Sequence, residues 1–340
     1  MSTHPPSEAM EWDGHVESAA DLARHLAALH AVDEHGQPLA SAGVLNLVTV
    51  TRVEDALEFE AIIESLSDHQ PSRAIILERA WDGEGIEAHL ETRTQTFGGA
   101  KRESLVELLR LTLHGETTGG AASAVRSLLR PDLPVYLWWP GAPDLSDPVY
   151  AEVSEGADRV VTEAGRGPNA VTALLQLADA ALAGPALTDL AWAELTPWRQ
   201  LVNQLVDLDH IERLRQGAVA EIWHCGTSPT VSAYLLAGWL RDTLGDKLHV
   251  ELHPRKDVPG GGVVGLQLES LAGRRLAIDR FPDRSTAAVV VSAPTEKARR
   301  RVLPLPYKDR AQLLAGELEL QRRDHPFERA LPHAREVATR

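Results

Sequence analysis

From residue 43 onward, hydrophobic positions alternate between two patterns, one typical of strands and one typical of helices. Apolar residues recur three and four positions apart over 56–67 and 169–182, which predicts amphipathic helices. Short β-branched or apolar runs predict buried strands. These runs are 44–51, 73–78, 133–139 and 158–163. The repeated order of strand and then helix predicts a mainly parallel sheet in one layer, with helices on both faces.

The pattern changes after Gly184-Pro185, where we expect the boundary between two α/β domains. Segments 263–271 and 274–281 read as two strands around Ala272-Gly273, which predicts an antiparallel hairpin. The other elements predicted in this smaller domain are a helix over 196–207, a strand over 219–224, a helix over 229–244, strands over 249–253 and 287–292, and a charged helix from Lys308 broken at 324–326. We expect domains over 16–184 and 185–340.

Four further segments lie within the first 114 residues. Residues 1–15 contain few apolar groups and are predicted to be disordered. Ser18 then resembles an N-cap, with Asp21 in the first turn of a helix that runs to about Ala31. Segment 86–97 alternates polar and apolar residues, as an edge or half-exposed strand does, whereas 105–114 fits a helix and a strand equally well.

The composition is that of a globular protein, but its charge is unevenly distributed. The 340 residues carry a net charge of −15. Residues 1–200 hold 13 Lys and Arg against 31 Asp and Glu, a balance of −18, and residues 201–340 hold 21 against 18, a balance of +3. An acidic half repels phosphate backbones, so we expect no nucleic-acid partner.

Cysteine and hydropathy point to a cytoplasmic protein. Cys225 is the one cysteine in the chain, so no internal disulfide can form, which suits a reducing compartment. The first 14 residues are polar and acidic, which predicts no secretory signal. No uncharged apolar run reaches the roughly 20 residues that a membrane span needs. We therefore expect neither secretion nor a membrane partner.

No catalytic or metal motif stands out. The chain has no C-x-x-C, H-E-x-x-H or G-x-S-x-G pattern, and Gly260-Gly261-Gly262 lie in a hairpin-like turn instead of at a strand-to-helix junction, so we predict no metal site, no cofactor and no catalytic residue. Cys225 lies between a predicted strand and a predicted helix, where a thiolate could be activated. A lone cysteine at the end of a buried strand is more commonly a small hydrophobic residue, and we predict that it is buried and chemically quiet.

The segment after Cys225 is a weak candidate for an anion site. Gly226, Thr227, Ser228 and Thr230 offer amides and hydroxyls ahead of a predicted helix, as a phosphate pocket does. Capping of that helix by Ser or Thr explains the same residues. The alternative to a binding protein is accordingly a sugar-phosphate or nucleotide-binding enzyme or sensor that uses the 226–230 loop.

Two groups of residues are candidates for binding a protein partner. Trp138 and Trp139 are adjacent in a predicted strand, so they face opposite sides and one of them is a candidate aromatic anchor. The second group is a basic cluster, unexpected in an acidic chain, for which a merely solvated face is the alternative. Its members are Lys297, Arg299, Arg300, Arg301, Lys308 and Arg310.

Several segments together resemble one family. Leu129 to Val135 (LRPDLPV), followed by Leu137 to Gly141 (LWWPG), resembles the signature of the glucose-6-phosphate dehydrogenase assembly proteins, the OpcA family. Similar segments are 71–76 (PSRAII), 157–161 (ADRVV), 189–192 (DLAW) and 195–199 (LTPWR), and their order and spacing fit the family from about 40 to 330. The family's strand often ends in Asp after ADRV, where this chain has Thr162-Glu163.

The resemblance implies two domains and a role as a non-catalytic partner that binds, assembles or activates glucose-6-phosphate dehydrogenase in the oxidative pentose phosphate pathway. It implies no cofactor. Redox control through cysteines, described for some photosynthetic relatives, cannot work here through an intramolecular disulfide, because there is one thiol. A homo-oligomeric structural protein is a third hypothesis.

Overall fold

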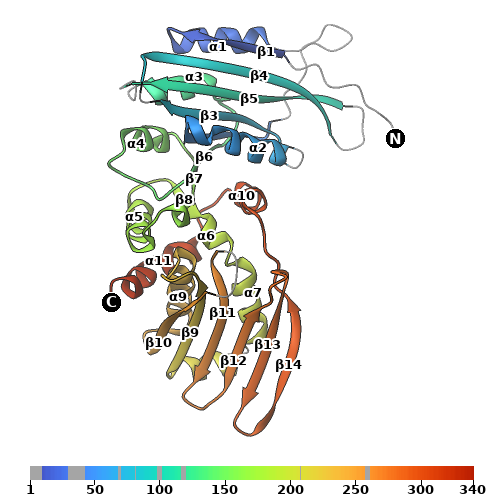
Figure 1. Cartoon of the computed structure of the whole chain (residues 1–340), viewed down its shortest axis with the longest axis vertical. Helices are drawn as coiled ribbons and strands as arrows, with labels where there is room; N and C mark the ends of the chain where they lie inside the picture. Colours follow the sequence, from blue (N-terminus) through green and yellow to red (C-terminus); the bar gives the residue numbers. More distant parts are fainter. Residues whose placement is uncertain are drawn as a thin grey trace.

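The computed structural model describes residues 10–29, 43–67, 70–80, 82–97, 102–115, 120–206, 208–256 and 261–340. Figure 1 shows two β-sheets at opposite ends of an elongated molecule, with helices packed between them. The fold class expected from the sequence, a two-part α/β protein with a parallel sheet and an antiparallel hairpin, is confirmed.

The first sheet has eight strands in the order β1-β4-β5-β3-β2-β6-β7-β8. The strands are β1 (Met10–Val16), β2 (Leu45–Arg52), β3 (Ser72–Ala80), β4 (Gly85–Phe97), β5 (Arg102–His114), β6 (Val135–Trp139), β7 (Arg159–Thr162) and β8 (Ala186–Asp189). The six adjacent strands β5, β3, β2, β6, β7 and β8 are parallel. Taken in this order across the sheet, they are the third, second, first, fourth, fifth and sixth of the six along the chain. This is the doubly wound arrangement, whose order reverses between β2 and β6.

The four strands expected in one sheet are confirmed as β2, β3, β6 and β7. The ambiguous segment 105–114 is a strand, because β5 pairs with β3 on one side and with β4 on the other. The prediction of disorder over 1–15 is wrong from Met10 onward. There β1 forms the edge of the sheet against β4, and the Trp12 ring stacks on the His25 ring with their centroids 3.9 Å apart. Residues 1–9 lie outside the described residues.

Helices cover both faces of the first sheet. On one face lie α1 (Ala19–Ala28), α3 (Ala121–Leu128), α4 (Pro148–Glu155) and α5 (Ala170–Ala183), and on the other lie α2 (Ala56–Ser67) and α10 (Arg310–Leu318). Ser18 caps α1 by accepting from the amide of Asp21, as expected. Leu314 and Leu318 of α10 pack with Tyr136 and Trp138, so a late segment of the chain completes the core of the first sheet.

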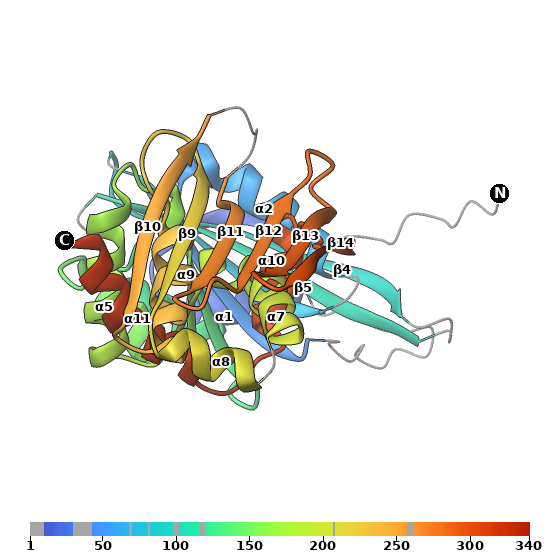
Figure 2. The ribbon, with the colours of Figure 1, turned by 90° about the horizontal axis from the view of Figure 1, so that it is seen from below.

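The second sheet has six strands in the order β10-β9-β11-β12-β13-β14. They are β9 (Ala218–Cys225), β10 (Leu248–Arg255), β11 (Val263–Ser270), β12 (Arg275–Arg280), β13 (Thr286–Ala293) and β14 (Glu296–Pro304). β9 and β10 are parallel and the other pairs are antiparallel, including the expected hairpin of β11 and β12. Figure 2 shows these strands side by side, with β10 and β14 at the two edges.

The inner face of the second sheet packs on a central helix, α9 (Val231–Leu244), in which 12 residues are buried. The surrounding helices are α6 (Leu190–Ala193), α7 (Thr196–Leu205), α8 (Leu208–Arg215) and α11 (His325–Ala338). Gly238 lets α11 cross α9 closely, because a Cβ there would overlap the carbonyl of Ala330. The predicted break in the C-terminal helix separates α10 from α11, and Asp324 caps α11 by accepting from the amide of Phe327.

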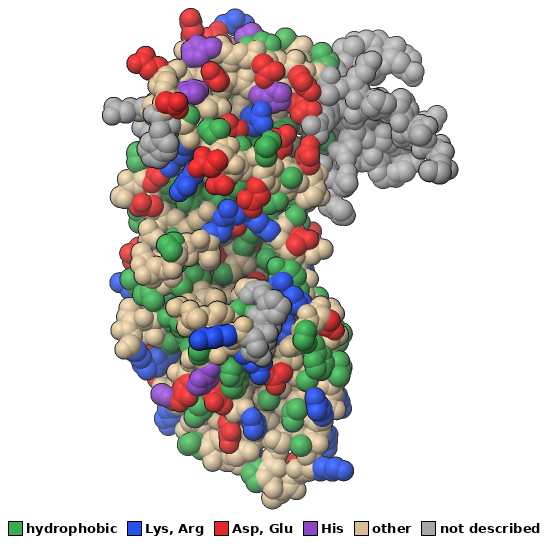
Figure 3. Space-filling model, viewed as in Figure 1, with side chains coloured by type: hydrophobic (Ala, Val, Ile, Leu, Met, Phe, Trp, Pro, Cys, Tyr) green, Lys and Arg blue, Asp and Glu red, His purple; other side chains and the backbone are tan. Residues whose placement is uncertain are grey.

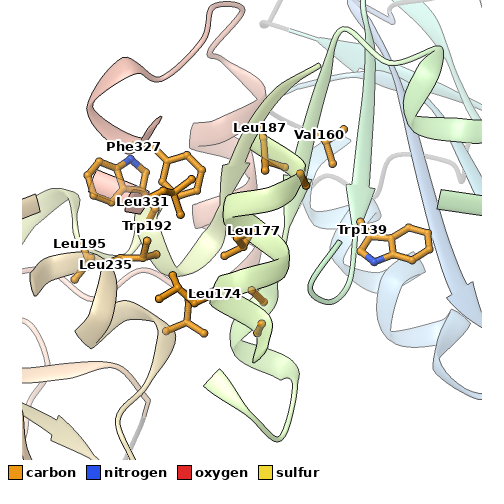
Figure 4. Close-up of a cluster of buried hydrophobic side chains, with 14 of the residues drawn as sticks. Trp139, Val160, Leu174, Leu177, Leu187, Trp192, Leu195, Leu235, Phe327 and Leu331 are labelled. Atoms are coloured by element: carbon orange, nitrogen blue, oxygen red, sulfur yellow. The ribbon is translucent and has the colours of Figure 1, made fainter. Parts of the chain in front are cut away.

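One hydrophobic core connects the two sheets. Trp192 of α6 packs against Phe327 of α11, and Figure 4 shows these rings beside Leu235 of α9 and near Leu174 and Leu177 of α5. β8 follows Gly184 and pairs with β7, so the first sheet extends beyond the boundary expected from the sequence. The later segments α10 and α11 then return to the first sheet and to α5.

Candidate functional site

In a doubly wound sheet, ligands bind outside the carboxyl ends of the strands where the strand order reverses. Here that point is the turn from β2 into α2. A dinucleotide site would have glycines at this turn, which let the backbone approach a pyrophosphate at the helix N-terminus. The residues from Arg52 to Glu60 (RVEDALEFE) contain no glycine and place Glu54, Asp55 and Glu58 near the start of the helix. Carboxylates repel the phosphates that this turn would otherwise attract.

Arg310 of α10 lies at this same edge of the sheet. Its Nε donates to both carboxylate oxygens of Glu163, at 2.8 and 2.9 Å, and the Trp138 indole donates to the same carboxylate at 2.6 Å. The guanidinium lies over the rings of Phe59 and Trp138, 4.6 and 4.9 Å from their centroids. Arg310 also pairs with Glu58. The edge is therefore occupied by side chains of the chain itself.

Glu58 is held in its ionised form at this edge. Arg166 donates to Glu58 at 3.1 Å, and this hydrogen bond, more than the charge of Arg310, lowers the pKa of Glu58 below its ordinary value. Two arginines and two glutamates thus form one network at the carboxyl edge.

Neither tryptophan of the predicted anchor pair is exposed. Trp138 is fully buried against Phe59, with ring centroids 4.7 Å apart. Trp139 is 8% exposed, donates to the carbonyl of Ala142 at 3.1 Å and packs edge-on against Tyr150. Neither candidate anchor offers an exposed ring, because helices cover both faces of β6 and each ring faces a covered side.

The predicted basic cluster divides into two parts. Lys297, Arg299, Arg300 and Arg301 are exposed along β14. Among the described strands β14 pairs only with β13, so it forms an edge of the second sheet. Lys308 is exposed beyond that strand, whereas Arg310 belongs to the network with Glu163. We call Lys297, Arg299, Arg300 and Arg301 the basic strand. Figure 3 shows acidic side chains gathered instead over the half that holds the first sheet.

The 226–230 loop connects β9 to α9. Gly226 has a φ of +82°, which favours glycine, and Thr227 and Ser228 are exposed. Thr230 caps α9 by accepting from the amide of Ala233 at 3.2 Å, so one of the four anion-site candidates acts as a helix cap. Cys225, just before the loop, is buried as predicted, and burial raises the pKa of its thiol.

Next to Cys225 lies a set of buried polar side chains that the sequence did not single out. Arg280 of β12 is 7% exposed and faces the ring of Trp198 at 5.2 Å. Burial raises the pKa of Glu194, which follows α6, to about 7, although Arg280 and Arg284 lower it. No local spacing could reveal this set, because its members come from three separated segments of the chain.

Two other polar features were also missed. A hollow of about 280 Å³ on the first sheet is lined by acidic and histidine side chains, among them Asp13, Glu87 and His89. On the second sheet, the His253 Nε2 lies 3.6 Å from a Glu221 oxygen and 3.4 Å from a Glu251 oxygen.

Comparison with known families finds two domain models in order along the chain, both described as parts of a "Glucose-6-phosphate dehydrogenase subunit". The model of the N-terminal domain matches residues 63–179, and the model of the C-terminal domain matches residues 185–331. The second match begins at the residue expected to open the C-terminal domain, although β8 still belongs to the first sheet.

Two curated relatives carry the name "Putative OxPP cycle protein OpcA". The protein from Synechocystis is 28% identical over 172 residues, which are 49% of this chain and 34% of that protein. The protein from Nostoc punctiforme is 27% identical over 141 residues, 38% of this chain and 29% of that protein. The matched part thus spans about a third of the length of these relatives.

Solved structures with a similar arrangement include a mutant 3-ketoreductase from Actinomadura kijaniata and an oxidoreductase from Sinorhizobium meliloti. The TM-score is 0.47 for both, with 13% and 9% identity. The two matches cover 87% and 86% of this chain, and 96% and 95% of the respective solved chains. At such scores the likeness supports no inference about chemistry.

Proposed function

The chain belongs to the OpcA family of glucose-6-phosphate dehydrogenase subunits, and from this premise we propose that it is a non-catalytic partner that binds that dehydrogenase and assembles or activates it. The observation that carries the proposal is the pair of family domain models, matched in order within one chain. We propose that it acts in the oxidative pentose phosphate pathway, in the cytoplasm. A single cysteine is compatible with that reducing compartment, because the fold does not rely on an internal disulfide.

The carboxyl edge of the first sheet supports a role without catalysis. Its turn carries Glu54, Asp55 and Glu58 instead of glycines, and Arg310 and Glu163 occupy the edge where a cofactor would otherwise lie. A pyrophosphate would have to displace a partly buried ion pair and approach three carboxylates. Among the described residues, no helix is long and apolar enough to cross a membrane.

An activator acts through differential affinity. It shifts an enzyme's conformers only if it binds the active one more tightly than the inactive one. We place the contact on the basic strand, because its exposed cations would steer the chain toward an acidic surface of the dehydrogenase. Lys and Arg on an edge strand also prevent edge-to-edge pairing with other chains, which is the alternative role of these residues.

Co-purification and kinetics test the proposal directly. The purified chain is mixed with the dehydrogenase of the same cell, and we expect co-elution in size exclusion and an increase in kcat, a decrease in KM, or both. The chain alone, given NADP⁺ and glucose 6-phosphate, should produce no NADPH. Turnover by the chain alone would overturn the non-catalytic role. Failure both to co-elute and to change the rate would overturn the partnership.

A further inference from the structure

The inner face of the second sheet ends in a cluster of buried polar side chains. Gly265 of β11 pairs with Trp223 on one side and with Asp279 on the other. The next residues of those strands, His224 and Arg280, therefore lie at the same end of the sheet and on its inner, helix-covered face. Both are buried, with exposed fractions of 1% and 7%.

Nitrogen atoms in this cluster have no hydrogen-bond partner. Within the part of the chain that the structure describes, they are the Arg280 Nε and Nη2, the Trp198 indole nitrogen and the His224 Nε2. Leaving a buried donor unpaired costs free energy, so buried polar groups nearly always have partners. The unpaired nitrogens of Arg280 and Trp198 are donors, come from two separate elements, and call for an acceptor-rich molecule.

The charges of the cluster favour an anion. Arg280 and Arg284 both interact electrostatically with Glu194 and with Cys225. No ion pair among the described residues joins either arginine to Glu194. A buried cation is normally paired, and water can fill its hydrogen bonds but cannot neutralise its charge. The Glu194 carboxyl lies against the Cα of Gly262, so any side chain at position 262 would overlap this carboxyl.

The segment that leads into α9 begins at the same end of the sheet as Arg280. Cys225, which interacts with both of them, directly precedes the Gly226–Thr230 loop and the 14-residue helix. The N-terminus of a helix favours negative charge, and the exposed Thr227 and Ser228 add hydroxyls there. The loop singled out in the sequence and the unpaired Arg280 thus lie at the same end of the second sheet.

We propose that this cluster binds a small phosphorylated metabolite of the sugar-phosphate class, with its phosphate on Arg280 and Arg284 and a hydroxyl group on Glu194. The Trp198 ring provides an apolar surface beside Arg280. Such a site would make the chain a sensor of a metabolite. It goes beyond the partnership with the dehydrogenase and does not depend on it.

Thermal unfolding of the full chain tests the site without any partner protein. The probes are inorganic phosphate, a hexose 6-phosphate and the unphosphorylated hexose, at fixed ionic strength. We expect both phosphates to raise the Tm, the hexose phosphate at lower concentration, and the hexose to leave it unchanged, since a ligand of the folded state stabilises it. No shift with either phosphate would overturn the proposal.

Variants connect the shift to the cluster. Arg280→Gln should weaken binding of the hexose phosphate about tenfold or more, because it removes charge-assisted hydrogen bonds. Arg275→Gln, an exposed arginine at the other end of the same strand, is the control and should bind normally. If Arg280→Gln does not fold, Arg284→Gln replaces it, since Arg284 is partly exposed in the turn after β12. Equal binding by the cluster variant and the control would overturn the assignment.

Discussion

Arg310 illustrates how much one side chain of α10 contributes to the first sheet. It pairs with Glu163, whose exposed fraction is 7%, and covers the rings of Phe59 and Trp138. Removing one partner of a buried pair leaves the other charge uncompensated, which costs more than the pair itself contributes. The cation of Arg310 is therefore a structural requirement of this edge.

We expect Arg310→Ala to lower the free energy of unfolding by about 2 to 3 kcal/mol, because Glu163 is left unpaired and two rings lose their cover. Urea unfolding measures this change. Lys308→Ala, two positions earlier and exposed, should stay within about 0.5 kcal/mol of the parent protein. Equal stability of the two variants would show that Arg310 is a solvated residue like the rest of the basic cluster.

Glu194 should make stability depend on pH. Its pKa is raised to about 7 by burial, from an ordinary value of 4.5, although Arg280 and Arg284 lower it. The folded chain therefore holds this proton more tightly than the unfolded chain, and the free energy of unfolding falls as pH rises from about 4.5 to about 7. Asp189, with a pKa raised to about 6, acts in the same direction.

Glu194→Gln should remove part of that fall, about 1 to 3 kcal/mol between pH 4.5 and 7, since a tenfold difference in proton affinity corresponds to about 1.4 kcal/mol. Urea unfolding of both proteins at several pH values measures the difference. Glu269→Gln, an exposed glutamate of β11, serves as the control. Parallel stability curves for the parent protein and Glu194→Gln would contradict a raised pKa.

At the scale of elements, the basic strand gives the sharpest test of docking. We expect Arg299→Glu combined with Arg300→Glu to slow association with the dehydrogenase at least several-fold, and more at low salt, because steering charges act mainly on the association rate. Surface plasmon resonance at two salt concentrations measures it. Arg213→Glu with Lys247→Glu, exposed cations elsewhere on the same half, is the matched control. If the first pair leaves the rate and its salt dependence unchanged, the dehydrogenase does not dock there.

The sequence predicted several elements whose own side chains are buried, although it missed β8, whose four residues are buried as well. β2, β3, β6 and β7 are buried runs, and α2 has the bounds that its periodicity indicated. β1 and β14 were missed because their side chains are mostly exposed and polar, so their strand conformation depends on pairing with β4 and β13.

The candidate sites show the same limit. Adjacent tryptophans in a strand must face opposite sides, but their spacing cannot reveal that helices cover both sides. One of the two helices over the Trp138 side, α10, lies more than 170 positions later in the chain. Likewise His224 and Arg280 lie at one end of the second sheet only because β9, β11 and β12 are paired in register, and Trp198 of α7 faces Arg280 there. Such juxtapositions follow from the topology, which short-range patterns do not encode.

At the scale of the whole molecule, the chain crosses twice between its two sheets. The connection through β8 and α6 leads to the second sheet, and α10 and α11 return to the first sheet and to α5. Arg159 of β7 fixes this return by pairing with Glu317 of α10 at 3.0 Å, and both side chains are buried. The two halves matched by separate family models therefore share one core.

A shared core predicts that the two halves unfold together. We expect one calorimetric transition, with equal calorimetric and van't Hoff enthalpies, because neither sheet keeps its cover when the other unfolds. Gly238→Val makes the test specific, since its side chain would overlap the Ala330 carbonyl and force α11 away from α9. This substitution, far from the first sheet, should weaken hydrogen-exchange protection in β2 and β9 alike. Loss of protection in β9 alone, or a stable fragment of residues 1–184, would show that α10 and α11 are accessory to the first sheet and that the halves are independent domains.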